Sequence, residues 1–216
     1  MLTRFIAAIL AAGVATRRST IGAAPMSSAM TTLSLPLRTE RLLLRPFEPD
    51  DLDELHAIMS RPDIVRFVPW EPRDRPAVRA VLAARVGGEQ EGLSLAVVLD
   101  GPGGPLIGDI SLFGLVPEQG TAEIGFIFHP DHHGRGYASE AVSAVIGAAF
   151  AELGLHRIVG RCDARNAPSI RLMERIGMRR EAHLIENEYL KGEWTDELDF
   201  AVLARELRAA RAAEGS

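Results

Sequence analysis

Apolar residues recur along this chain in short runs of strand length, separated by segments with the apolar spacing of helices. The strand-like runs occupy residues 41–47, 93–99, 106–113, 122–128, 155–162, 178–190 and 194–203. The helix-like segments occupy residues 52–58, 74–86, 139–153 and 166–176. These periods predict about seven strands and about four helices in the order βααβββαβαββ.

Turn-forming residues separate these segments and set the direction of the chain. Pro49-Asp50-Asp51 is typical of a helix start, and Gly87-Gly88 is typical of a helix end. Asp100-Gly101 and Lys191-Gly192-Glu193 each predict a turn between two antiparallel strands. The order of elements predicts an α/β (α+β) fold class, with one mixed, mostly antiparallel sheet flanked by helices on both faces.

The first residues differ in composition from the rest. An apolar run over residues 5–15 resembles the core of a signal peptide, but it is too short to span a bilayer. Arg17-Arg18 directly after the run argues against export. Because Met26 and Met30 lie just before the globular pattern begins, we interpret residues 1–32 as a disordered extension or the product of a misplaced start codon.

Length and charge narrow the class of protein. A chain of 216 residues with 47% hydrophobic residues is predicted to form one domain, over residues 33–205, with a tail at 206–216. A net charge of -5 disfavours nucleic acid as a partner and favours small molecules or cationic partners. The single cysteine, Cys162, excludes an internal disulfide and indicates a reducing compartment, the cytoplasm. No membrane partner is expected.

A glycine-rich turn joins the apolar run at 122–128 to the helix-like segment at 139–153. It reads His133-Gly134-Arg135-Gly136-Tyr137-Ala138. Such a turn at a helix start presents unpaired backbone N–H groups and the positive end of the helix dipole. The pattern is typical of a cradle for an anion such as phosphate, and a plain turn that binds nothing is the alternative.

Several histidines crowd this turn. His129, Asp131, His132 and His133 lie almost consecutively in the sequence. Side chains at consecutive positions rarely converge on one ion, because metal ligands usually follow helical or strand spacing or come from separate elements. We therefore expect no metal site.

Three motifs in order resemble the GNAT superfamily of acyl-CoA-dependent N-acyltransferases. Residues 37–46 (LRTERLLLRP) resemble the first strand of the branch that includes ribosomal-protein N-terminal acetyltransferases. Residues 133–138 fit the superfamily's Q/R-x-x-G-x-G/A motif, although His133 replaces the usual glutamine or arginine. Residues 166–178 resemble its N-x-x-S-x-x-x-x-E-x-x-G-F element. The resemblance implies a GNAT-like fold and an acetyl-CoA-dependent N-acetyltransferase.

The resemblance also assigns the coenzyme site. It places the pyrophosphate of acetyl-CoA at His133, Gly134, Arg135, Gly136, Tyr137 and Ala138. It places the pantetheine arm beside the strand that ends at Phe128, which is expected to separate from a neighbouring strand. Asn166 and Ser169 would complete the coenzyme contacts.

Acetyl transfer to an amine needs a base, a donor for the oxyanion and, usefully, an acid for the leaving thiolate. The resemblance implies Ser169 as the acid, because Met173 stands where many relatives have tyrosine. Glu123 is the best-placed base, acting directly or through a water, and a backbone N–H near Ile127 or Phe128 would serve the oxyanion. Each side chain has a structural alternative: a helix cap for Asn166, a first-turn residue for Ser169 and an ion pair for Glu123.

The acceptor amine leaves a weaker signal. Phe67, Trp70 and Glu71 lie in the loop that borders the acceptor groove in relatives, and Glu186 and Glu188 add negative charge. The expected reaction is direct transfer to a protein N-terminus or a small amine in a ternary complex. The alternative is a non-catalytic acyl-CoA sensor. Apolar strand edges near residues 178–203 favour a homodimer.

Overall fold

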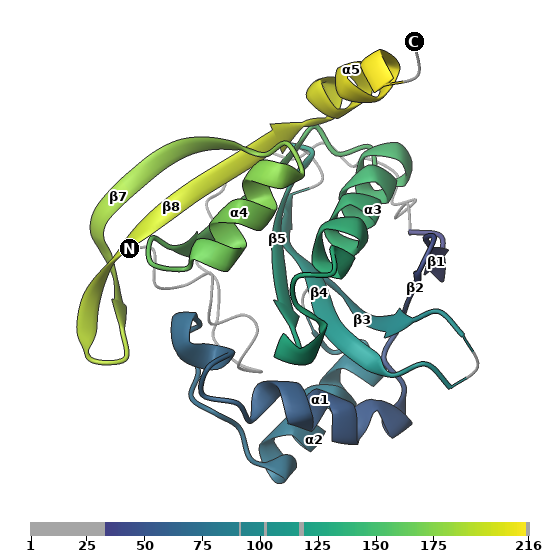
Figure 1. The fold of residues 1–216 in the computed structure, drawn as a ribbon, viewed down its shortest axis with the longest axis vertical. Coiled ribbons are helices and arrows are strands. Elements are labelled where there is room, and N and C mark those ends of the chain that lie inside the picture. The colour runs from purple at the N-terminus through teal and green to yellow at the C-terminus, as the bar shows by residue number, and fades with distance from the viewer. Residues whose placement is uncertain (1–32, 91, 102, 117–118, 215–216) are drawn as a thin grey trace, which may run out of the picture.

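The computed structural model describes residues 33–90, 92–101, 103–116 and 119–214. The extension expected at residues 1–32 lies outside the described residues. One sheet of eight strands, in the order β1-β2-β3-β4-β5-β6-β8-β7, organises the described chain (Figure 1). All neighbouring strands run antiparallel except β5 and β6, so the predicted mixed, mostly antiparallel sheet is confirmed.

The strands are β1 (Leu37–Arg38), β2 (Leu42–Arg45), β3 (Leu93–Leu99), β4 (Leu106–Val116), β5 (Thr121–Phe128), β6 (Arg157–Asp163), β7 (Arg179–Leu190) and β8 (Glu193–Leu203). The helices are α1 (Leu52–Met59), α2 (Arg75–Val86), α3 (Tyr137–Glu152), α4 (Ala167–Arg175) and α5 (Ala204–Glu214), with short 3-10 turns η2 (Pro49–Asp51), η3 (Val65–Phe67) and η4 (Pro130–His132). The sequence did not predict β1 or α5. None of the helices in the described ranges is long and apolar enough to cross a membrane.

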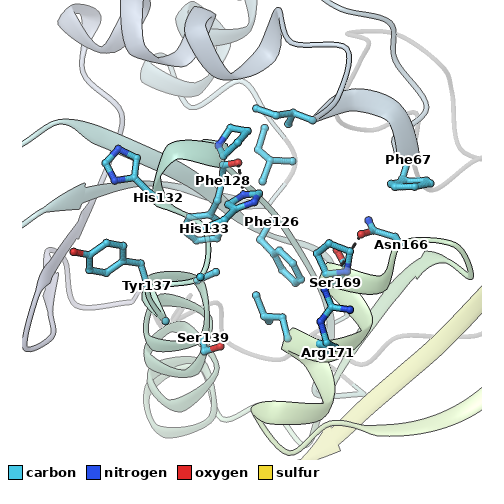
Figure 2. A pocket seen from close by; sticks show the side chains of 18 of the residues that line it. Phe67, Phe126, Phe128, His132, His133, Tyr137, Ser139, Asn166, Ser169 and Arg171 are labelled. Atoms are coloured by element: carbon cyan, nitrogen blue, oxygen red, sulfur yellow. Dashed lines mark hydrogen bonds between the residues drawn. The ribbon is translucent and has the colours of Figure 1, made fainter.

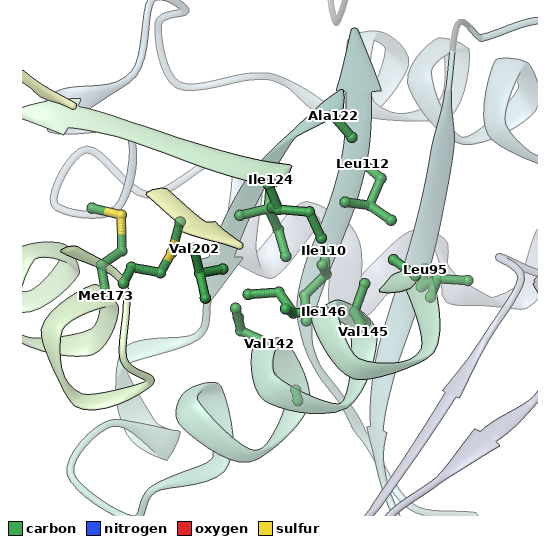
Figure 3. Packing of buried hydrophobic residues seen from close by; sticks show 14 of the residues in the cluster. Leu95, Ile110, Leu112, Ala122, Ile124, Val142, Val145, Ile146, Met173 and Val202 are labelled. Carbon is green, nitrogen blue, oxygen red and sulfur yellow. The ribbon is translucent and has the colours of Figure 1, made fainter. Parts of the chain in front are cut away.

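Each face of the sheet is covered by a pair of helices. Side chains alternate between the two faces along a strand, so β4 and β5 each contribute to two cores. On one face, Ile110, Leu112 and Ile124 pack against Val142 and Ile146 of α3 (Figure 3). On the other face, the buried side chains come mainly from α1, α2, β3 and β4: Leu55, Ile58, Met59, Val78, Leu82, Ala96, Val98 and Leu106.

The parallel pair β5–β6 is short. Its register runs only from Thr121 opposite Arg157 to Glu123 opposite Val159. Beyond that point β5 stays paired with β4, and β6 stays paired with β8. The sheet therefore splits, and the edge of β5 from residue 124 to 128 has no neighbouring strand among the described residues.

The direction of the free groups on this edge follows from the ladder with β4. The His129 N–H donates to the Ile107 carbonyl oxygen at 2.9 Å. Because backbone groups of an antiparallel strand point alternately to the two sides, those of Phe126 and Phe128 point away from β4, into the split, where the Phe128 carbonyl oxygen accepts a hydrogen bond from His133.

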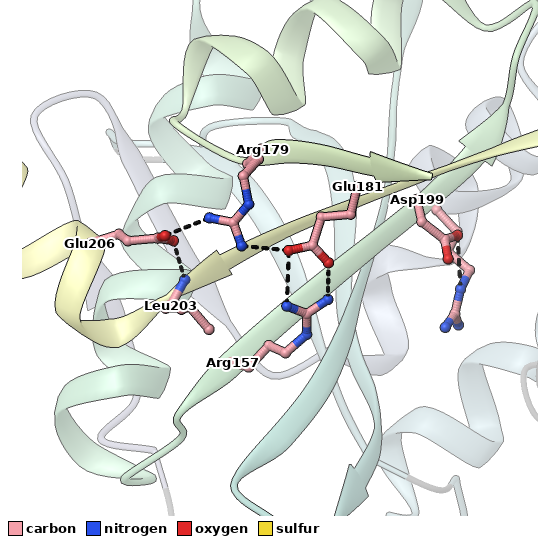
Figure 4. Close-up of polar contacts among 7 residues, drawn as sticks. Arg157, Arg179, Glu181, Asp199, Leu203 and Glu206 are labelled. Carbon is pink, nitrogen blue, oxygen red and sulfur yellow. Dashed lines mark hydrogen bonds and ion pairs between the residues drawn. The ribbon is translucent and has the colours of Figure 1, made fainter. Parts of the chain in front are cut away.

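The C-terminal helix is held to the sheet by charges. Glu181 on β7 pairs with Arg157 on β6 and with Arg179, and Arg179 also pairs with Glu206 of α5 (Figure 4). Glu206 in turn accepts a hydrogen bond from the Leu203 N–H at 2.9 Å. The two arginines lower the pKa of Glu181 to about 2, which keeps the carboxylate charged.

A second polar cluster fixes the start of α3. Glu140 accepts hydrogen bonds from Thr39 Oγ1 at 2.6 Å and from Arg41 Nε at 2.7 Å. Arg41 Nη1 also donates to the carbonyl oxygen of Arg135 at 3.0 Å. The turn before β2 thus clamps both the glycine loop and the first turn of α3.

We expect Glu140→Gln to lower the melting temperature at pH 7 by about 3 °C. Partial burial favours the neutral acid, but the hydrogen bonds from Thr39 and Arg41 outweigh it and lower the pKa of Glu140. A lowered pKa stabilises the fold above the unfolded pKa, and this stabilisation disappears as the pH falls through the folded pKa. The difference in melting temperature between Glu140→Gln and wild type should therefore shrink below about pH 4.

Scanning calorimetry across this pH range measures the effect. Glu174→Gln, at an exposed position of α4, is the control and should leave the melting temperature unchanged. Equal melting temperatures for wild type and Glu140→Gln at pH 7 would contradict the clamp.

Candidate active site

Two cavities open where β5 leaves β6. The larger has a volume of about 520 Å³ and the smaller about 140 Å³. They share six lining residues, which come from the η3 loop, β5 and the start of α4: Phe67, Val68, Phe126, Ile127, Asn166 and Ser169. The two cavities therefore meet at the split in the sheet.

The glycine loop forms one end of the larger cavity. Gly134 and Gly136 have φ angles of +74° and +82°, which favour glycine. The first backbone hydrogen bond of α3 joins the Glu140 N–H to the Gly136 carbonyl oxygen at 3.0 Å. The amide groups of the residues just before Glu140 are thus left without an acceptor in the helix, as an anion site requires.

Most of the residues expected at a coenzyme site line this larger cavity (Figure 2): Phe128, His133, Gly134, Gly136, Tyr137, Ala138, Asn166 and Ser169. Arg135 is not among the lining residues, and its carbonyl oxygen accepts the hydrogen bond from Arg41. His133 Nε2 donates to the carbonyl oxygen of Phe128 at 3.0 Å. The His133 side chain therefore fastens the loop to the end of β5.

The neighbouring histidines contact each other and other parts of this loop, and the rings of His129 and His132 meet edge to face. His129 Nδ1 accepts a hydrogen bond from the Asp131 N–H at 3.3 Å, whereas His132 packs its ring near Tyr137. Burial, and then the nearby His129, lower the pKa of His132. Within the described ranges, no three His, Cys, Asp or Glu side chains are grouped as metal ligands.

Asn166 and Ser169 lie at the start of α4, on the wall that both cavities share. Asn166 caps the helix, since its side-chain oxygen accepts a hydrogen bond from the Ser169 N–H at 3.3 Å (Figure 2). Asn166 therefore fills the cap role that the sequence left open. Ser169 is a first-turn residue that also lines both cavities.

Glu123 lines the smaller cavity, at the last position where β5 pairs with β6. Its carboxylate forms an ion pair with Arg161 of β6. The Nε of Arg161 also lies 3.2 Å from Oδ1 of Asp199 on β8. Burial raises the pKa of Glu123 to about 7, and the nearby Arg161 only partly opposes this shift. A carboxyl group with this pKa takes up and releases protons near neutral pH.

Two glutamates besides Glu123 line the smaller cavity, together with Asp109 and Asp163. Burial raises the pKa of Glu197 on β8 to about 7 and also raises that of Glu188 on β7. A bulge in β7 brings Glu188 opposite Thr195, and Asn187 within the bulge donates a hydrogen bond to Glu197. The cavity therefore offers a concentration of carboxyl groups that suits a cationic amine.

The two residues expected to bind the acceptor are placed differently. Trp70 lines the smaller cavity, but Glu71 lines neither cavity. Glu71 is exposed, and its Oε2 lies 3.6 Å from Lys191 Nζ. Lys191 donates to the Val65 carbonyl oxygen at 2.7 Å and so holds the η3 loop, with Phe67, against the β7–β8 hairpin.

Arg161 and Glu197 were missed by sequence reasoning. Both belong to alternating positions on strands, and Arg161 pairs in register with Asp199, whereas Glu197 pairs with Asp163. Period-two spacing alone shows that such residues share a face of their own strand. Only the strand order shows that this face adjoins Glu123.

Comparison with known proteins agrees with this geometry. A model of the GNAT acetyltransferase domain matches residues 41–179. YnaD, an uncharacterized N-acetyltransferase of Bacillus subtilis, is 34% identical over 170 residues, covering 79% of this chain and 98% of YnaD. The crystal structure of a GNAT-family acetyltransferase from Bacillus anthracis superposes with a TM-score of 0.74 at 35% identity, covering 80% of this chain and 100% of that one.

A spermidine N(1)-acetyltransferase of Vibrio cholerae is 30% identical over 91 residues, covering 42% of this chain and 53% of the relative. The split sheet, the glycine loop and these matches together define an acyltransferase. The chain belongs to the GNAT acetyltransferase family, and it is an acetyl-CoA-dependent acyltransferase.

We expect Arg161→Gln to raise the pKa of Glu123 above about 7, because the substitution removes the cation that favours the carboxylate. Carboxyl chemical shifts in an NMR titration, assigned with Glu123→Gln, measure this change. Arg180→Gln, at an exposed position on β7, is the control. An unchanged or lower Glu123 pKa in Arg161→Gln would contradict the pairing.

Proposed function

We propose that this enzyme transfers the acetyl group of acetyl-CoA to a primary amine by direct attack in a ternary complex. The observation that carries the proposal is the meeting of the two cavities at the split between β5 and β6. One cavity has the anion-binding loop, and the other has a carboxyl group that titrates near neutral pH. A thioester entering from the first cavity meets an amine entering from the second.

The larger cavity fits the coenzyme. The pyrophosphate would accept hydrogen bonds from backbone N–H groups of residues 134–138, where no side chain blocks the two glycines. Arg171 and Arg175, one helical turn apart on α4, line the same cavity and add positive charge for the phosphates. The free edge of β5 supplies backbone partners for the amides of the pantetheine arm.

The reaction follows from the groups at the junction. Glu123 accepts a proton from the ammonium, directly or through a water, and the amine nitrogen then attacks the thioester carbonyl carbon. The oxyanion accepts a hydrogen bond from backbone N–H at the end of β5, where the Phe128 N–H points into the split. As the carbon–sulfur bond breaks, the electron pair stays on sulfur and Ser169 donates a proton to the thiolate. The attacking nitrogen releases its second proton, which returns to Ser169 through solvent, so a neutral amide and CoA thiol remain.

The acceptor in this proposal is a protein N-terminus or a small amine. The carboxyl groups of Glu188 and Glu197 favour a cation in the smaller cavity, with Trp70 on its wall. The motif at residues 37–46 supports the branch of ribosomal-protein N-terminal acetyltransferases. We place the catalytic unit at residues 33–205 and its action in the cytoplasm, and the exposed edge strand β7 offers a surface for a homodimer.

We expect Gly136→Asp to weaken acetyl-CoA binding at least about tenfold more than Gly136→Ala does. Both variants introduce a Cβ at a φ of +82°, and this atom would lie 3.4 Å from Arg41 Nη2. The backbone strain is therefore common to both, and only Asp places a carboxylate against the pyrophosphate. Isothermal titration calorimetry with acetyl-CoA measures the difference. Equal affinities for the two variants would contradict the placement of the pyrophosphate at this loop.

We expect Glu123→Gln to lower kcat about a hundredfold or more, with little change in coenzyme affinity. Since the base works as a carboxylate and its pKa is about 7, wild-type kcat/KM should rise with pH and level off above pH 7. In Glu123→Gln, the pH profile of kcat/KM should lack the rise that has this pKa. Release of free CoA thiol with an amine acceptor measures both effects.

Ser169→Ala provides the matched comparison, because it removes the proposed acid and leaves the base in place. Ser169→Ala should lose activity, but its kcat/KM should still rise with pH and level off above pH 7. A Glu123→Gln enzyme with wild-type kcat and an unchanged pH profile would exclude Glu123 as the base. Acetyl-CoA binding without turnover of any amine would point instead to a sensor.

A further inference from the structure

Two hydrogen-bond donors on the wall of the smaller cavity have no acceptor within the described ranges. These are Nη1 of Arg85 and Nε1 of Trp70, and both atoms are buried. Both residues line the smaller cavity. Buried donors without a partner are energetically costly, so they indicate where a bound molecule places an acceptor atom.

Arg85 is held rigidly in this position. Its Nη2 lies 2.5 Å from the Asp109 carboxylate, and only 4% of its side chain is exposed. The guanidinium also stacks over the ring of Phe47, with 4.6 Å between the carbon and the ring centroid. Because Asp109 and Phe47 fix the plane of the guanidinium, the direction of the Nη1 donor is fixed as well.

The strand register separates the Arg85 donor from the base. Asp109, the partner of Arg85, pairs with Ile127, and Glu123 pairs with Phe113, so the two positions are four residues apart along β4. At about 3.4 Å per residue the two backbone positions are about 14 Å apart. The smaller cavity thus has the Glu123 carboxylate at one position and the Arg85 donor at the other.

From this arrangement we infer that the acceptor is an amine whose own chain carries carbonyl oxygens, as in a peptide, and that Arg85 Nη1 and Trp70 Nε1 bind such oxygens. The inference rests on the proposed function, because it assigns the amine end to Glu123. A carbonyl oxygen is an acceptor only, so it suits either donor. An alkyl polyamine offers only ammonium groups, which repel Arg85.

A comparison of acceptors tests the inference. Tetra-alanine amide and spermidine both carry a primary amine, but only the tetrapeptide amide carries carbonyl oxygens. Four extended residues span about 14 Å, so this peptide reaches from Glu123 to the Arg85 position. We expect kcat/KM for the tetrapeptide amide to exceed that for spermidine at least tenfold. An eight-residue peptide distinguishes the two sources of this chemistry: a higher value than for the tetrapeptide amide indicates a protein N-terminus, and an equal value indicates a small peptide.

Two variants remove the donors separately. Trp70→Phe keeps a ring but loses the N–H, and Arg85→Lys keeps the charge opposite Asp109 but loses the guanidinium fork. Each should lower kcat/KM for the tetrapeptide amide about fivefold to tenfold more than it lowers kcat/KM for spermidine. Trp194→Phe, which alters an exposed tryptophan on β8, is the control and should keep the wild-type preference.

The possible failures are distinguishable. If spermidine is acetylated as efficiently as the tetrapeptide amide, or if the variants lower both values equally, this inference is wrong while the proposed function stands. If acetyl-CoA binds but no peptide or polyamine releases CoA thiol, the proposed function fails and the inference fails with it.

Discussion

The early separation of β5 from β6 is the constraint on which the rest of the site depends. Three paired positions join the strands, and each strand then continues with its other neighbour. Buried backbone N–H and C=O groups need partners, so the free edge of β5 is stable only beside water or a ligand that can replace the missing strand. Both cavities, the helix start at Ser169 and the carboxyl group of Glu123 are arranged around this gap.

The charges of the site follow from the same geometry. Glu123 is buried at the point where the sheet divides, and burial dominates its pKa even though Arg161 is its ion-pair partner. The bulge in β7 adds Glu188 to the same cavity. Carboxyl groups gather on one side of the split and backbone N–H donors on the other, so amine and phosphate are drawn to opposite sides.

Much of this architecture was predictable from local patterns. Period-two runs located β3, β5 and β8 to within one residue, and the glycine loop and the Asn166 cap marked the starts of α3 and α4. The two-residue β1 was too short to produce a pattern. The helix α5 lies in an alanine-rich and charged end, and its attachment through Glu206 and Arg179 depends on the tertiary position of β7. The sequence patterns therefore predicted elements better than the contacts between them.

The residues of the candidate site also fall into two groups: those that sequence motifs predict, and those that only the fold brings together. Gly134, Gly136, Asn166 and Ser169 belong to continuous motifs, and the structure brings them to one cavity. Arg161, Glu197 and the Arg85–Asp109 pair come from separate elements, and the strand order β4-β5-β6-β8 together with the packing of α2 brings them to the second cavity. Glu71 is the opposite case. Its place in an aromatic loop suggests a binding role, but its carboxylate pairs with Lys191 at the surface.

Hydrogen–deuterium exchange with and without acetyl-CoA tests the role of the split sheet most directly. If the coenzyme replaces the missing strand, the amides of Phe126 and Phe128 and those of residues 134–139 should gain protection together. Amides of β4 that already pair with β5 should change little by comparison. Protection confined to other elements, or no added protection along β5 at saturating acetyl-CoA, would contradict the account.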